Sequence, residues 1–251
     1  MSKNIIVGIL AVGLILVALI LAFGAKTTTI ISEGADQRNV ISVTGQSELS
    51  VQPDEAELYI RIKTEATTAK AAKDENTVIT NNVMQALLKD GFKKEDIESY
   101  QFSIYPKQRW DEEEETYETY GYECEHTLKA TTKDTEKAGD YIDTAVNAGA
   151  NGIDRVEFTL SNEYEKDVKG QTMILASNDA KEKAEALTTN LGVSLGKITS
   201  ISESNFVYSP YVYYGADRAM AEGGGAFEEK TTIQPQKLEV QGYVSLVFEI
   251  K

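Results

Sequence analysis

The chain has 251 residues, and its 40 aspartates and glutamates outnumber its 25 lysines and arginines, which gives a formal net charge of −15. A protein this acidic repels a phosphate backbone, so nucleic acid is a poor partner for it. Cys124 is the only cysteine, and this excludes an intrachain disulfide.

The first predicted element is the apolar run of residues 5–23, from Ile5 to Phe23, which contains no charged or polar side chain. At ~1.5 Å per residue, a helix of this length crosses the ~30 Å hydrocarbon core of a bilayer. We predict that residues 1–25 are a transmembrane signal-anchor and that residues 26–39 are a linker. The protein would then be a single-pass membrane protein with its body outside the cytoplasm. The alternative is a signal peptide cut before Ala25, which would leave a secreted or periplasmic protein.

The body begins with two predicted strands, in which apolar and polar residues alternate. They cover residues 40–51 and 56–63, and Pro53-Asp54 predicts the turn between them. Gly45, in the first strand, indicates a bulge or a close approach of another backbone.

Three helices are expected from the 3.6-residue period of apolar positions. They cover residues 68–89, about 138–146 and 167–191, and the glycines that end them are Gly91, Gly149 and Gly192. Asp134 is the predicted N-cap of the second helix. The third helix carries a stripe of mostly small residues that suits close packing on a sheet: Ala176, Ala180, Ala184, Leu187 and Leu191.

Further strands are predicted at residues 97–106, 120–131, 152–160, 197–203 and 238–250. Because strands and helices alternate irregularly, we expect an α+β fold, with a largely antiparallel sheet and about three packed helices. The domain would cover residues 40–251, with an irregular insertion over residues 206–237.

The most acidic segment, residues 111–118, holds six carboxylates in eight positions. Such a run repels itself, which predicts a solvated hairpin tip. A Ca²⁺ loop is the alternative, but the run lacks the spaced ligands and the glycine of such loops.

Cys124 and His126 lie two apart on a predicted strand and therefore share a face. Two ligands do not make a metal site, and no sequence motif marks a nucleophile for His126 to activate. No phosphate-binding glycine motif is present either. We therefore expect no catalytic residue, no cofactor and no metal; the alternative is a hydrolase or a redox enzyme of an unfamiliar type.

The start of the predicted insertion is rich in aromatic residues, which are favoured at protein interfaces. The alternative is a loop that folds back on its own domain. The interface candidates are Phe206, Tyr208, Tyr211, Tyr213 and Tyr214.

Several short motifs are spread along the body: Ile41-Ser42-Val43-Thr44-Gly45, Pro53-Asp54, Asp96-Ile97, Tyr105-Pro106, Gly121-Tyr122, Gly149-Ala150, Ile153, Phe158, Ala176, Ala180, Lys183-Ala184, Leu191-Gly192 and Leu195-Gly196. In this order and spacing they resemble the SIMPL-domain family, which includes bacterial periplasmic immunogenic and oxidative-stress-linked proteins. The resemblance covers residues 40–205 and the last predicted strand. The glycines and Pro53-Asp54 are explained by turns and bulges, so the motifs mark a fold and not an active site.

The resemblance implies an exported α+β domain without established catalytic residues. Some members of the family assemble into ring-like oligomers, and others are linked to stress defence. We therefore expect a membrane-anchored, extracytoplasmic, non-enzymatic domain that acts by self-association or by binding a protein partner, with a role in envelope stress defence. The retained anchor and the insertion are the points at which this chain departs from the family.

Overall fold

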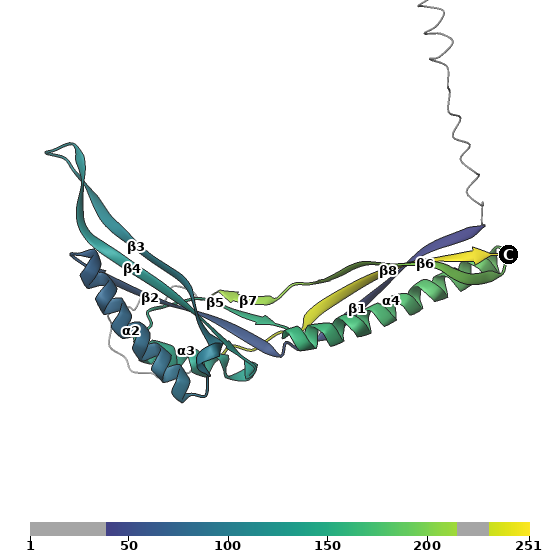
Figure 1. Ribbon diagram of the computed structural model, residues 1–251, viewed down its shortest axis with the longest axis horizontal. Helices are drawn as coiled ribbons and strands as arrows, with labels where there is room; N and C mark the ends of the chain where they lie inside the picture. Colours follow the sequence, from purple (N-terminus) through teal and green to yellow (C-terminus); the bar gives the residue numbers. More distant parts are fainter. Residues whose placement is uncertain (1–38, 215–230) are drawn as a thin grey trace, which may run out of the picture. The chain divides into compact units, whose positions relative to one another are not determined.

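The computed structural model describes residues 39–214 and 231–251 (Figure 1). The predicted signal-anchor, nearly all of the predicted linker and the middle of the predicted insertion lie outside these ranges. Among the described residues, no helix has both the length and the apolar character needed to cross a membrane. Residues 40–251 form one structural unit, which contains two antiparallel sheets where we expected one.

The three-stranded sheet has the order β1-β8-β6. Its strands are β1 (Val40–Val51), β8 (Leu238–Ile250) and β6 (Leu195–Tyr208). The central strand β8 pairs with β1 in register along the whole length of β1, from Val40 opposite Glu249 to Val51 opposite Leu238. One long helix, α4 (Asn162–Asn190), runs along this sheet (Figure 1).

Helix α4 packs on the sheet through small residues spaced by four: Val168, Thr172, Ala176, Ala180, Ala184 and Thr188. A spacing of four drifts around a helix with 3.6 residues per turn, so the buried line crosses the helix obliquely. For this reason Leu187 and Leu191, which we predicted in the stripe, are instead 48% and 69% exposed. Gly45 allows the close approach predicted for it, because a Cβ there would lie 1.9 Å from the carbonyl oxygen of Ala176.

The start of α4 lies five residues before the predicted one, and two side chains fix it. The Ser161 hydroxyl oxygen accepts from the main-chain N–H of Tyr164 as an N-cap. The Asp54 carboxylate, in the turn between β1 and β2, accepts from the N–H and the hydroxyl of Ser161 at 2.7 and 2.6 Å. The Pro53-Asp54 motif therefore both turns the chain and anchors the start of a distant helix.

The five-stranded sheet has the order β3-β4-β2-β5-β7. Its strands are β3 (Ile97–Asp111), β4 (Thr116–Thr132), β2 (Glu55–Ala66), β5 (Gly152–Thr159) and β7 (Tyr211–Tyr214). Helices α2 (Ala69–Lys89) and α3 (Ala138–Asn147) cover one face (Figure 1). The largest side chains buried between them are Phe158, Leu58, Ile60, Ile62, Leu87 and Leu128.

The helix ends largely follow the predicted caps. Gly91, Gly149 and Gly192 all have a positive φ, as expected of residues that end a helix in the left-handed conformation. Asp134 does not cap α3 directly. It precedes the short 3-10 helix η2 (Thr135–Lys137), makes no capping bond from its side chain, and instead accepts from Lys137 Nζ at 2.9 Å. A second 3-10 turn, η1 (Lys94–Asp96), leads into β3.

Strands β3 and β4 are longer than predicted and project as a two-stranded arm (Figure 1). The neighbouring strand β2 ends at Ala66, opposite Tyr122 of β4. Beyond that point β3 and β4 pair only with each other, as far as Asp111 opposite Thr116. We call residues 105–120 the β3–β4 arm; Tyr105 and Pro106, at its base, lie opposite Glu123 and Tyr122, where β2 still pairs with β4. Strand β6 is also longer than predicted, and with β7 it takes up the first part of the segment that we expected to be irregular.

Candidate functional site

Cys124 and His126 share a face of β4, as predicted, and this face is the one that α2 covers. The Cys124 side chain is fully buried. Burial raises the pKa of its thiol, which keeps the group protonated and unreactive at neutral pH. Cys124 is therefore a small core residue.

His126 is half-buried and makes two side-chain hydrogen bonds. Its Nε2 lies 2.9 Å from the hydroxyl oxygen of Ser99 on β3, and its Nδ1 lies 3.3 Å from that of Thr80 on α2. The ring of Phe102 meets the imidazole edge to face, with centroids 5.3 Å apart. Burial lowers the pKa of His126, so the imidazole is neutral at neutral pH. The sequence analysis found no partner for His126, whereas the structure supplies a serine.

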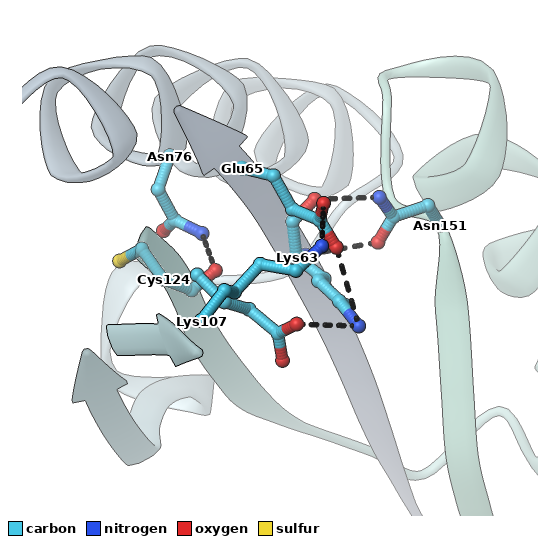
Figure 2. Close-up of polar contacts among 7 residues, drawn as sticks. Lys63, Glu65, Asn76, Lys107, Cys124 and Asn151 are labelled. Atoms are coloured by element: carbon cyan, nitrogen blue, oxygen red, sulfur yellow. Dashed lines mark hydrogen bonds and ion pairs between the residues drawn. The ribbon is translucent and has the colours of Figure 1, made fainter. Parts of the chain in front are cut away.

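Asn76, fully buried on α2, fixes the direction of the hydrogen bonds behind His126. Its amide nitrogen donates to the carbonyl oxygen of Ile62 at 2.8 Å and to that of Cys124 at 3.2 Å, and Figure 2 shows the second of these bonds. The amide oxygen therefore faces Thr80 and accepts the proton of its hydroxyl at 3.2 Å. Since that proton is used, the Thr80 oxygen can only accept from Nδ1–H of His126.

The same reasoning assigns the other imidazole nitrogen. With the proton on Nδ1, the neutral ring carries a lone pair on Nε2. The Ser99 hydroxyl, which is exposed at the surface, must then donate to Nε2. Asn76, Thr80, His126 and Ser99 thus form a hydrogen-bonded chain with one direction, from the buried core to solvent.

A bulge in β3 brings Ser99 to His126. The register between β3 and β4 shifts between Ser99 and Gln101, so Tyr100 is an extra residue. Strict alternation would place Ser99 and Phe102 on opposite faces of the sheet, but the extra residue puts both beside His126. No sequence signal that we used marks this bulge, which is why the serine was missed.

The face of the five-stranded sheet opposite the helices carries a network of ion pairs. Lys63 Nζ lies 2.8 Å from Glu123 and 3.7 Å from Glu65, and Lys107 also donates to Glu65 (Figure 2). The Lys107 ammonium lowers the pKa of the Glu65 carboxyl. Asn151 fixes the main chain of Lys63 through two hydrogen bonds, of 2.9 and 2.7 Å. These lysines are therefore neutralised within the sheet and do not form a basic patch for an anionic ligand.

The acidic segment 111–118 spans the tip of the arm, and the turn itself is residues 112–115. The Asp111 carboxylate accepts from the main-chain N–H groups of Glu113 and Glu114, and Glu118 pairs with Arg109 at 3.0 Å. Within residues 39–214 and 231–251, no group of three or more His, Cys, Asp or Glu side chains is arranged to hold a metal ion. The contacts that the structure shows for Asp111 and Glu118 therefore stabilise the turn and the strands beside it.

The five interface candidates divide into two groups. Phe206, Tyr208 and Tyr211 pack against the cores of their own unit. Tyr213 and Tyr214, in the edge strand β7, are 42% and 72% exposed. At the other end of the expected insertion, Ile233 is buried in the core under α3. The segment thus folds back in part, and Tyr213 and Tyr214 are the candidates that stay most exposed.

The β3–β4 arm exposes more aromatic surface than these candidates do. Trp110, the only tryptophan, lies opposite Tyr117, and their ring centroids are 5.1 Å apart. Tyr120 is exposed on the same arm, and Tyr105 is exposed at its base. The sequence carried a signal for this surface, because Tyr105, Trp110 and Tyr120 flank the acidic run and Tyr117 lies within it.

The whole domain matches a known family. A family model described as SIMPL, a protein of unknown function (DUF541), matches residues 41–248. The chain belongs to the SIMPL family. The expected membership is therefore confirmed, and it carries no activity with it, since the function of the family is itself described as unknown.

Two curated relatives of this SIMPL protein carry the name 26 kDa periplasmic immunogenic protein. They come from Brucella melitensis biotype 1 and Brucella abortus strain S19, and each is 27% identical over 217 residues, which is 84% of this chain and 84% of the relative. Their name places those proteins in the periplasm and says nothing of a reaction or a partner.

Proposed function

We propose that this SIMPL protein is a non-enzymatic binding domain, held outside the cytoplasm by its N-terminal segment, which works by self-association or by binding a protein partner. A role in envelope stress defence is the setting that the family resemblance implies. The observation that carries the binding role is the exposed aromatic surface of the β3–β4 arm.

The location is supported by the apolar run of residues 5–23 and by the periplasmic name of the relatives. When external protease is added to intact cells, or to spheroplasts where an outer membrane is present, we expect the body to be degraded. The full chain should sediment with membranes, because an apolar run of this length is stable in a bilayer. A body that is protected in the cytoplasm, while a cytoplasmic marker also stays intact, would contradict this location.

The arm has the features of an interaction surface. A two-stranded ribbon is marginally stable alone, so exposed rings on it do not serve a core. Strand β3 is also an edge strand of its sheet, and edge strands can pair with a strand from another chain. The ion pair between Arg109 and Glu118 neutralises one of the six carboxylates of the tip, and an interface with a second acidic chain would have to leave the other five in solvent.

The energy available from these rings is limited. Burying the exposed halves of four such aromatic side chains removes about 400 Å² of surface, worth about 10 kcal/mol before costs at ~25 cal/mol per Å². Loss of translational freedom and ordering of side chains offset much of this. The rings alone therefore support a weak interface, and strand pairing at the edge of β3 would have to add to it.

The double variant Trp110→Ser, Tyr117→Ser should weaken association by about tenfold to a hundredfold, because buried aromatic anchors dominate interfaces. The measurement is the mass of the full chain in detergent across a concentration series, together with cross-linking in cells. The matched variant Tyr213→Ser, Tyr214→Ser tests the two exposed candidates on β7. Substitutions are preferable to deleting residues 206–236, which would remove β7 and the buried Ile233.

Unchanged cross-links and an unchanged mass in the arm variant would show that the arm is not the interface. A monomer at high salt and high concentration in every variant would exclude self-association.

A further inference from the structure

Ser99 stands in the position of a nucleophile beside its base. Its hydroxyl lies 2.9 Å from Nε2 of His126, within the range expected for a nucleophile and a general base. The hydrogen-bonded chain from Asn76 through Thr80 holds the imidazole in the tautomer that accepts from Ser99. The ring is thereby oriented by a third group, as in enzymes that activate a serine.

We propose that Ser99 is a nucleophilic serine activated by His126, and that it is a site of covalent acylation by activated esters. The Ser99 oxygen attacks the ester carbonyl carbon and forms a new C–O bond, while the bond from that carbon to the leaving oxygen breaks. The hydroxyl proton passes to Nε2 of His126 and then to the leaving group. The products are O-acyl-Ser99 and an alcohol, and no further reactant is required.

The surroundings limit this chemistry to a single covalent step. Behind the imidazole stand a hydroxyl and an amide, so no carboxylate among the described residues in contact with it stabilises the imidazolium. Ser99 is exposed, and the hollow of about 750 Å³ beside residues 231–235 is lined by other residues. Because none of the residues that the structure describes around Ser99 encloses a substrate, we expect a reactive side chain that selects weakly among small acyl donors and does not turn over.

The test uses p-nitrophenyl acetate on the full chain in detergent, with acetylated peptides quantified by mass spectrometry. Ser103, four residues along β3 and paired with Glu125, is the internal control on the same strand. We expect Ser99 to be acetylated at least ~100-fold faster than Ser103, which is the lower range of general-base catalysis. In His126→Gln, the rate at Ser99 should fall to that of Ser103.

The dependence on pH separates activation from mere exposure. Within the described residues, the groups in contact with the His126 ring are the hydroxyls of Thr80 and Ser99 and the ring of Phe102, all uncharged, and its neighbour on the same face of the strand is the neutral thiol of Cys124. Burial lowers the pKa of His126, so the rate at Ser99 should rise with pH through an inflection below ~6.5, the ordinary value for histidine. The rate at Ser103 should show no such inflection.

Thr80 is a positioning residue, and two variants test it. Thr80→Val removes the acceptor for Nδ1–H, so the rate at Ser99 should fall and the inflection should move to lower pH, because the imidazolium loses a hydrogen bond. Thr80→Ser keeps the acceptor and should restore both. If circular dichroism shows that His126→Gln does not fold, the two Thr80 variants and the pH profile of the wild type decide whether His126 activates Ser99.

Equal rates at Ser99 and Ser103 in the wild type would overturn the proposal. So would an unchanged rate at Ser99 in a folded His126→Gln variant, or a wild-type profile without an inflection below ~6.5.

Discussion

Replacing Gly45 by alanine should destabilise the domain by about 3 kcal/mol or more, at the upper end of what overpacking costs. The new Cβ would lie 1.9 Å from the carbonyl oxygen of Ala176 and 2.6 Å from the amide nitrogen of Ala180. Both are backbone atoms of α4, so a side chain cannot simply rotate away. The helix would have to move off β1, which separates the stripe of small residues from the sheet.

The matched control is Gly170→Ala, in α4 itself. A Cβ at Gly170 meets nothing within 4 Å, and alanine is favoured over glycine within a helix by about 1 kcal/mol. Guanidinium unfolding of the purified chain should therefore move in opposite directions for the two variants. An unchanged midpoint in Gly45→Ala would show that α4 does not approach β1 this closely.

Asn76→Asp should destabilise the domain by about 3 kcal/mol or more at neutral pH, because it places an uncompensated charge in the core. The amide of Asn76 donates to the carbonyl oxygens of Ile62 and Cys124. A carboxylate has no proton to donate, and it would face both oxygens with a negative charge. Urea unfolding at pH 7 measures the loss.

The pH dependence of Asn76→Asp gives a second readout. The folded state would favour the protonated carboxyl, so the new group takes up its proton at a higher pH in the folded chain than in the unfolded one. Its destabilisation should shrink as the pH falls from 7 towards ~4. Asn151→Asp is the control, since Asn151 also donates to a carbonyl oxygen, that of Lys63, but at the surface (Figure 2). It should cost about 1 kcal/mol or less, and an equal loss in both variants would contradict a buried role for Asn76.

Sequence reasoning located elements whose signals are local. The bounds of β1 were predicted correctly because apolar and polar residues alternate along it, and the three glycines end their helices because each adopts a positive φ. The division into two sheets was not predictable in this way, because it depends on which strands pair. Leu187 and Leu191 were misplaced because apolar character alone does not show how a helix crosses a sheet.

The candidate site was predicted only in part, for a similar reason. The shared face of Cys124 and His126 follows from their spacing on one strand. The partners of His126 come from β3 and α2, and Ser99 reaches it only through the bulge at Tyr100. Likewise, the sequence shows that the segment is rich in aromatic residues, but it does not show that Phe206 and Tyr211 pack on a core. For this reason both were predicted as interface candidates.

The pairing of β1 with β8 also sets an order of folding. Strand β8 is central to its sheet, and both β1 and β6 pair with it. The five-stranded sheet needs only residues that precede β8, so it can complete while β8 is still being synthesised. The three-stranded sheet cannot begin before then. Strand β6 can pair with β8 across the shorter connection of residues 209–237, but the pairing of β1 with β8 must close a loop that contains the whole of the other sheet, which slows folding. A chain that is still on the ribosome, or only partly across a membrane, therefore lacks this sheet, and until it forms α4 has no surface on which to bury its alanines.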